Sequence, residues 1–240
     1  MNKTVLITGA SGDIGSEIAR TFISNGYTVV GIYNTNEVAA RNLSEELGDN
    51  FHFFKFNLAD FGNAEILFNI LSDKELYPDI LINNAGISVV GLLQDMDNKT
   101  WDNLWNTNVT SVIAMSRQAI PVFLKHGYGK IINISSVWGN VGAACETGYS
   151  ATKGAVNSFT KALAKELAPS NIQVNALSCG IIDTKMNRHL SQDDINDIVE
   201  EIPASRIGTP KDIAEAALAL AQAGSYITGQ IISVDGGWQI

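Results

Sequence analysis

The sequence predicts an α/β fold: a doubly wound parallel sheet of about seven strands with helices on both faces, in a single domain that spans residues 1–240. Short apolar runs rich in β-branched residues alternate with helical patterns from one end of the chain to the other. Such alternation gives parallel strands joined by right-handed crossovers. A length of 240 residues suits one α/β domain, and no linker, low-complexity run or block of charge divides the chain.

The first third of the chain repeats a strand-then-helix pattern. An apolar run at 4–7 leads through a glycine-rich turn into a helix, in which Ile14, Ile18 and Phe22 recur at steps of three and four. Gly26 is expected to end this helix as a C-cap. A strand over 28–33, a charged helix over 37–47, a strand over 51–56, a helix over 63–71 and a strand over 80–82 are expected to follow.

The remainder of the chain continues the alternation. Asp97 is expected to cap a long helix that reaches 124. A fifth strand over 130–135 precedes a helix that contains Tyr149 and ends near 167. A sixth strand over 173–177, a polar helix over 191–200, a helix that starts at Pro210 and a last strand over 231–234 complete the prediction.

Composition and charge exclude several classes of function. The net charge is −9, whereas nucleic acids require a basic surface, and this charge gives no basis for binding an anionic membrane. No apolar run is long enough to cross a bilayer, and no signal peptide precedes the first strand. Cys145 and Cys179 show neither a metal-binding spacing nor a disulfide pattern, and the three histidines are scattered. We therefore expect a cytoplasmic protein without a metal site.

The turn after the first strand contains glycines at positions 9, 12 and 15. Glycines in this turn allow backbone N–H groups at a helix N-terminus to approach a pyrophosphate. Asp13 occupies the place where a glycine would complete a G-x-x-x-G-x-G pattern. The strand–turn–helix–strand context favours a dinucleotide site, and the alternative is an ordinary turn between a strand and a helix.

Polar residues and glycines follow several strands where those strands end. Thr8, Asn83, Ser136 and the pair Cys179–Gly180 all lie at or just beyond predicted carboxyl ends. Ligands of open parallel sheets bind outside this edge. The sequence thus indicates a ligand site there.

Tyr149 and Lys153 are four residues apart in a predicted helix, and so share one face. A free tyrosine has a pKa near 10, and an ammonium group within about 4–6 Å lowers it. The pair is a candidate proton donor and acceptor. The alternative for this motif alone is an amphipathic helix with a tyrosine at its edge.

The chain resembles the short-chain dehydrogenase/reductase family over essentially its full length, and within it most closely the 3-oxoacyl-(acyl carrier protein) reductases. Ser136 precedes Tyr149 by the spacing of that family. The other matching features are the turn at 8–15, the segment Asn83-Asn84-Ala85-Gly86, Asn108, Tyr149, Lys153, the segment Ile182-Asp183-Thr184, and the tail segments at 226–230 and 234–237. The resemblance implies a Rossmann-type fold and a nicotinamide-dependent enzyme.

The resemblance also implies a role for each catalytic candidate. Tyr149 would donate a proton to the substrate carbonyl, and Ser136 would hydrogen-bond the same oxygen. Lys153 would hold the nicotinamide ribose and lower the pKa of Tyr149, and Asn108 would hold a water of the proton relay. The cofactor-binding residues implied are Gly9, Ser11, Gly12, Asp13, Ile14, Gly15, Asn34, Asn57, Leu58, Asn84, Ala85, Gly86, Tyr149, Lys153, Gly180, Ile182 and Thr184.

The end of the second strand bears on the choice of cofactor. Enzymes that use NAD usually place Asp or Glu there, against the ribose 2′-hydroxyl. Residues 33–36 contain no acid, which favours NADP, with NAD as the alternative. No arginine or lysine lies in this segment to pair with a 2′-phosphate, and Asp13 would repel that phosphate if it pointed inward.

The function expected from the resemblance is NAD(P)H-dependent reduction of a ketone to a secondary alcohol, with a 3-oxoacyl thioester as the favoured substrate. A first alternative is the same chemistry on a small free ketone, a sugar or a sterol alcohol. A second, from another class, is a non-catalytic dinucleotide-binding subunit or sensor. The complete set of four catalytic candidates argues against this second alternative.

The resemblance also implies a homotetramer. One interface is expected from the helices over 97–124 and around Tyr149, which carry Trp101, Trp105, Met115, Phe159 and Leu163. The last strand and the terminal residues 238–240 are expected to form the second interface, because exposed Trp and Ile tend to mark contact surfaces. The alternative is that Trp238 packs into its own domain.

Overall fold

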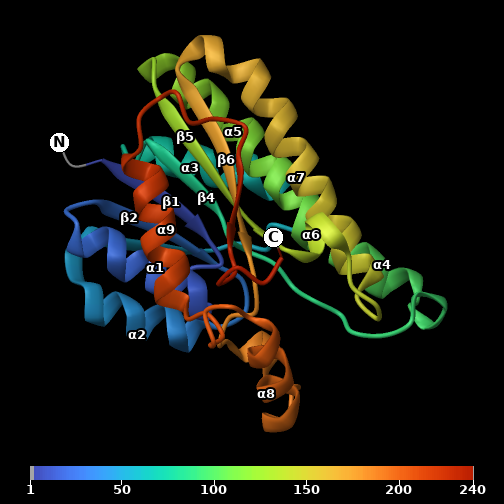
Figure 1. Ribbon diagram of the computed structural model, residues 1–240. Coiled ribbons are helices and arrows are strands. Elements are labelled where there is room, and N and C mark those ends of the chain that lie inside the picture. Colours follow the sequence, from blue (N-terminus) through green and yellow to red (C-terminus); the bar gives the residue numbers. More distant parts are fainter. Residues whose placement is uncertain (1–2, 240) are drawn as a thin grey trace.

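A computed structural model describes residues 3–239, and in it seven parallel strands form one sheet (Figure 1). The order across the sheet is β3-β2-β1-β4-β5-β6-β7, so the chain crosses from the β3 edge back to the centre before it enters β4. The strands are β1 (Thr4–Thr8), β2 (Thr28–Tyr33), β3 (Phe51–Lys55), β4 (Ile80–Asn83), β5 (Gly129–Ser136), β6 (Ile172–Cys179) and β7 (Ile231–Val234). The predicted doubly wound α/β fold is confirmed.

Helices cover both faces of the sheet (Figure 1). They are α1 (Asp13–Ser24), α2 (Glu37–Leu47), α3 (Gly62–Asp73), α4 (Asn98–Trp105), α5 (Ser111–His126), α6 (Trp138–Val141), α7 (Thr147–Leu167), α8 (Gln192–Glu201) and α9 (Pro210–Gln222). One buried apolar cluster joins α1, α2 and α9 to the sheet, and a second joins α3, α5 and α7 to the opposite face. No helix within residues 3–239 is long and apolar enough to span a membrane.

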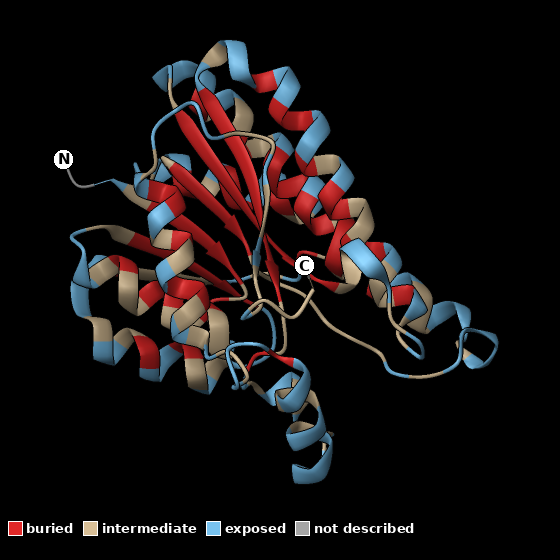
Figure 2. Cartoon of the chain, in the orientation of Figure 1, coloured by how far each residue is buried: buried red, intermediate tan, exposed pale blue. Residues whose placement is uncertain are grey.

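The central strands are buried on both faces, as the red arrows of Figure 2 show. Every residue of β4, β5 and β6 is buried. Parallel strands of this kind have nearly continuous apolar sequences instead of alternating ones, because helices shield both sides. Consequently the polar residues at their carboxyl ends are also partly shielded, and that edge becomes the floor of a cavity.

The helix expected over 97–124 is not continuous. Asp97 caps α4 by accepting a hydrogen bond from the backbone N–H of Thr100 at 2.7 Å, as expected. A π-helical turn, Asn106–Thr110, then separates α4 from α5. Such turns occur frequently at functional sites, and this one contains Asn108.

Two residues expected at a subunit interface lie instead in the core of the chain itself. Met115 is fully buried and Leu163 is 7% exposed, both in the cluster that covers one face of the sheet. α5 and α7 pack against the sheet through this cluster, so these side chains are buried within the domain. Trp101, Trp105 and Phe159 are half-buried.

Lys130 has a structural role that its sequence position does not suggest. The residue is 5% exposed in the central strand β5. Its Nζ donates hydrogen bonds to the carbonyl oxygens of Leu220, at 3.1 Å, and Ala223. It thereby supplies a donor to carbonyl groups at the end of α9, where the Leu220 carbonyl also accepts from the backbone N–H of Ala223 at 3.3 Å.

Candidate active site

The glycine turn joins β1 to α1 in a conformation that side chains would block. Gly9 has a φ of +68°, and a Cβ on Gly15 would overlap the carbonyl oxygen of Gly9. The Asn84 amide braces the turn, since its Nδ2 donates to the carbonyl oxygens of Thr8 at 3.0 Å and Gly9 at 3.2 Å. The first N–H groups of α1 lack partners within the helix, which suits an anionic ligand.

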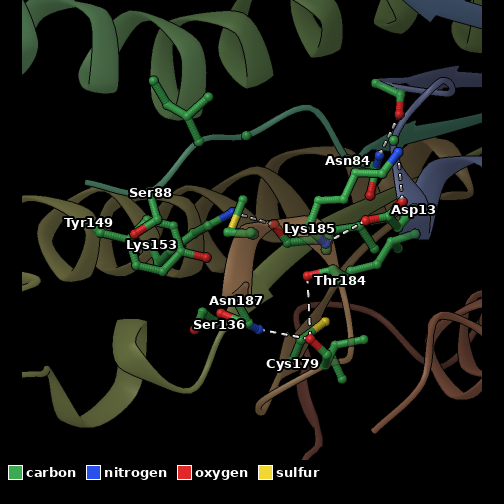
Figure 3. Close-up of a pocket in the computed structure, with 18 of the residues that line it drawn as sticks. Asp13, Asn84, Ser88, Ser136, Tyr149, Lys153, Cys179, Thr184, Lys185 and Asn187 are labelled. Carbon is green, nitrogen blue, oxygen red and sulfur yellow. Dashed lines mark hydrogen bonds and ion pairs between the residues drawn. The ribbon is translucent and has the colours of Figure 1, made fainter. Parts of the chain in front are cut away.

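Asp13, in the position of the missing glycine, contacts the segment that follows β6. Its Oδ2 accepts a hydrogen bond from the backbone N–H of Lys185 at 2.6 Å, and Lys185 Nζ lies 3.6 Å from Oδ1 (Figure 3). The carboxylate therefore connects the glycine turn to the segment on the other side of the cavity. Lys185 also offsets part of the negative charge of Asp13.

Ser136, Tyr149 and Lys153 come together at the carboxyl end of β5 (Figure 3). Ser136 is the last residue of β5, and Tyr149 and Lys153 lie one turn apart on α7. Lys153 is 5% exposed; its Nζ donates to the carbonyl oxygen of Ile134 at 2.8 Å and lies 5.5 Å from the centre of the Tyr149 ring. The expected clustering is present.

Asn108 lies behind this group, in the π-helical turn. Its side chain accepts from the backbone N–H of Ile87 at 2.9 Å and donates to the carbonyl oxygen of Ile87 at 2.8 Å. It also donates to Thr152 Oγ1 at 3.1 Å, which connects it to α7 between Tyr149 and Lys153. Asn108 thus fixes the strand-to-helix loop after β4 against the helix that carries the reactive side chains.

A single cavity of about 960 Å³ brings the candidate residues together. It is lined by three of the four catalytic candidates, Ser136, Tyr149 and Lys153, and by every proposed cofactor residue except Leu58, whereas Asn108 lies outside the lining. Leu58 lines a smaller adjoining cavity of about 70 Å³, together with Asn34 and Asn57. The cavity runs past the glycine turn to Tyr149, so an extended dinucleotide fits its shape and its backbone N–H donors.

Comparison with known proteins agrees with this arrangement. A family model described as enoyl-(acyl carrier protein) reductase matches residues 9–239. The uncharacterized oxidoreductase YmfI of Bacillus subtilis (strain 168) is 43% identical, covering 99% of this chain and 99% of that protein. The 3-oxoacyl-(acyl carrier protein) reductase FabG of Vibrio harveyi is 38% identical, covering 98% of this chain and 96% of that protein.

The chain belongs to the short-chain dehydrogenase/reductase family. Among solved structures, a 3-ketoacyl-(acyl carrier protein) reductase from Brucella melitensis, complexed with NADH, superposes with a TM-score of 0.93 at 32% identity. That match covers 99% of this chain and 98% of the other. The protein is therefore an oxidoreductase with a nicotinamide cofactor, and the alternative of a non-catalytic subunit is not supported.

The pKa values in this short-chain dehydrogenase/reductase site differ from one expectation. Burial is the largest cause that raises the pKa of the Tyr149 phenol above its usual value. The thiolate form of Cys179 and the charge of Glu146 act in the same direction and the hydrogen bond with Ser136 acts against them, so the pKa is raised where a lowering was expected. Burial also lowers the pKa of the Lys153 ammonium to about 8 and raises that of the Cys179 thiol to about 12. The physical reason is desolvation, which disfavours each charged form.

Several further residues of the cavity lining were not expected from the sequence, and four of them bear on the site. They are Ser88, Trp138, Glu146 and Trp238. Trp138 follows Ser136 by two positions and Glu146 precedes Tyr149 by three, so proximity to the motif residues was the available signal. Ser88 and Trp238 lie far from the motif residues in the sequence, and nothing in their own segments indicated a place in the cavity.

Trp238 lies against its own domain. Its ring packs edge-to-face on Trp138, with 5.1 Å between ring centres, and its Nε1 donates to Glu201 at 3.1 Å. The alternative considered for this residue is therefore what the structure shows, and Trp238 forms part of the cavity wall. Ile240, the last residue of the expected contact tail, lies outside the described residues.

Proposed function

We propose that the protein reduces a 3-oxoacyl thioester to the 3-hydroxyacyl thioester with NADPH. The observation that carries this proposal is the arrangement of Ser136, Tyr149 and Lys153 at one end of a cavity whose other end is the glycine turn. The relatives named as 3-oxoacyl-(acyl carrier protein) reductases, matched over nearly the whole chain, favour this substrate class. A carrier-bound acyl group is the form of substrate that those names imply.

The bound nicotinamide supplies the hydride, and the chain supplies binding and proton transfer. Tyr149 donates its proton to the ketone oxygen, and Ser136 hydrogen-bonds that oxygen and fixes its direction. Lys153 binds the ribose hydroxyls, and its ammonium stabilises the phenolate left on Tyr149. Asn108 holds the loop after β4 against the helix that carries Tyr149 and Lys153.

The preference for NADPH rests on the end of β2. Residues 33–36 carry no acid against the ribose, and the neutral side chains Asn34, Thr35 and Asn36 line the cavity there. Asn36 also caps α2 by accepting from the backbone N–H of Ala39. Amide and hydroxyl groups can donate hydrogen bonds to a 2′-phosphate.

Oxidation of NADPH in the presence of acetoacetyl-CoA tests the substrate class, with NADH in a parallel reaction. Turnover of the thioester at a higher kcat/KM than that of free ketones, sugars and sterols supports the proposal. Turnover of one of those free substrates alone refutes the thioester assignment and leaves the reductase assignment intact.

Substitution of Asn34 by arginine tests the position of the 2′-phosphate. Arg pairs with phosphate through two parallel hydrogen bonds, so Asn34→Arg is expected to increase the NADPH/NADH ratio of kcat/KM by about tenfold. Asn34→Gln is the control, because it lengthens the side chain without adding charge. An equal effect of both variants, or a fall in the ratio, would place the phosphate elsewhere.

A further inference from the structure

The cavity contains an acidic side chain that the proposed mechanism does not use. Glu146 is the N-cap residue of α7, one turn before Tyr149, and it lines the cavity beside Ser88. Ser88 Oγ donates a hydrogen bond to Glu146 Oε1 at 2.6 Å. Figure 3 shows Ser88 on the same side of the cavity as Tyr149 and Lys153.

One contact holds this carboxylate, and a second holds the loop that carries it. In addition to the Ser88 hydroxyl, the backbone N–H of Gly91 donates to the carbonyl oxygen of Cys145 at 2.7 Å. Cys145 has a φ of +60°, a left-handed conformation that non-glycine residues adopt only when their surroundings require it. The loop before α7 is thus joined to the segment after β4, and the position of Glu146 is fixed.

The charge of Glu146 is not balanced by a neighbouring cation. None of the ion pairs formed within residues 3–239 includes it. The Ser88 hydroxyl supplies one hydrogen bond and no charge. The charge of Glu146 is also the smallest of the four causes that shift the pKa of Tyr149, and it acts to raise that pKa.

Glu146 and Tyr149 line the same cavity, so a ketone bound at Tyr149 shares that cavity with the charge of Glu146. In a 3-oxo acid the carboxyl carbon is two bonds, roughly 2.5 Å, from the ketone carbon. Two like charges about 6 Å apart, at an effective dielectric constant of about 20, weaken binding by a factor on the order of 100. An ester or thioester at the same position carries no charge and escapes this repulsion.

We propose that Glu146, held by Ser88, determines substrate specificity: it rejects ketones that carry a free carboxylate next to the reacting carbonyl and admits the neutral ester or thioester. This inference rests on the proposed function only in placing the ketone oxygen between Ser136 and Tyr149. It identifies the substrate as a 3-oxoacyl group whose carboxyl carbon is bound in an ester or thioester.

A matched pair of substrates tests the proposal: acetoacetate and ethyl acetoacetate, which share the ketone and differ in charge. Glu146→Gln keeps the size of the side chain and the oxygen that accepts from Ser88. We expect this variant to increase the ratio of kcat/KM for the acid to that for the ester by about tenfold or more, chiefly through a lower KM for the acid. Competitive inhibition of ester reduction by acetoacetate is measured alongside, and should become stronger in the variant.

Glu45→Gln is the matched control, because Glu45 is exposed on α2 and its substitution changes the net charge equally. It should leave the ratio at its original value. Added salt should raise the ratio in the original enzyme more than in Glu146→Gln, since salt screens repulsion between charges.

An unchanged ratio and an unchanged inhibition constant in Glu146→Gln would overturn the inference, as would an equal change in Glu45→Gln. Neither result depends on acetoacetyl-CoA. Failure of the enzyme to reduce that thioester would refute the proposed function, while the acid and ester would still report on Glu146.

Discussion

Tyr149 lies half-buried beside Lys153 and Ser136, and phenylalanine can replace its ring while removing the hydroxyl proton. We expect Tyr149→Phe to retain the fold and cofactor binding and to lower kcat at least about 100-fold, which is the range of general acid catalysis. Single-turnover kinetics measure the loss, and quenching of tryptophan fluorescence by NADPH measures binding. Retention of more than roughly a tenth of kcat would contradict the role of proton donor.

Buried titratable side chains at the site make stability depend on pH. The pKa of Lys153 is about 8 in the folded protein and 10.5 without burial, so the unfolded chain binds more protons in this range and stability rises with pH. Burial shifts the pKa of Lys130 in the same direction. The pKa of Cys179 rises from 9.0 to about 12, so above pH 9 the unfolded chain binds fewer protons and stability falls.

Urea denaturation across this range should therefore show a maximum of the unfolding free energy near pH 9. The slope contributed by each group is at most about 1.4 kcal/mol per pH unit. Lys153→Met should reduce the rise below the maximum, and Cys179→Ala should reduce the fall above it. A continuous fall from pH 8 upward in the original protein would show that Lys153 keeps its ordinary pKa.

At the scale of elements, the bond from Lys130 to the end of α9 links a central strand to a surface helix. Lys130→Met preserves the apolar stem but leaves the carbonyl groups of Leu220 and Ala223 without this donor. We expect a loss of about 1–3 kcal/mol in unfolding free energy, because the Ala223 carbonyl loses its Lys130 donor while the Leu220 carbonyl keeps only the hydrogen bond from the Ala223 N–H. Lys211→Met, at an exposed position on the same helix, is the control and should change stability by less than about 0.5 kcal/mol.

Elements defined by their own sequence were predicted well. The bounds expected for β2, α2 and β7 are those observed, because each apolar or amphipathic run is enclosed by residues that end it. The prediction of one long helix over 97–124 was wrong, because a π-helical turn separates α4 from α5. Asn108, in this turn, hydrogen-bonds to Ile87 and Thr152. Helical periodicity in the sequence does not predict such contacts.

Some residues of the candidate site could likewise be predicted from the sequence, and others could not. Tyr149 and Lys153 were found because their spacing places them on one face of a helix, and Ser136 was found through the resemblance to the family. Ser88 meets Glu146 across 58 positions of the chain, and only the folded sheet brings them together. The raised pKa of Tyr149 likewise depends on burial, which depends on the whole fold.

At the scale of the molecule, the homotetramer expected from the resemblance remains a prediction. Trp101 and Trp105 stack with 6.0 Å between ring centres, and Ile113 and Leu124 of α5 are 37% and 49% exposed. Apolar side chains of this size on exposed helices are typical of contact surfaces. We expect light scattering to give four times the 25.8 kDa mass of the chain.

The substitution Ile113→Glu should lower this mass, because it would bury a charge at the first interface. Val38→Glu is the control, since Val38 is exposed on α2, on another part of the surface. A monomer mass for the original protein would refute the assembly. An unchanged tetramer in Ile113→Glu would show that the interface does not include this part of α5.

The cavity draws its lining from Gly9 at one end of the chain to Trp238 at the other, so no fragment of the protein contains the site. A ligand that binds there has no affinity for the unfolded chain, and each bound molecule opposes unfolding. At a free concentration 100 times the dissociation constant this amounts to about 2.7 kcal/mol. Proteases attack the transiently unfolded chain, so the lifetime of the protein in a cell follows the supply of its dinucleotide.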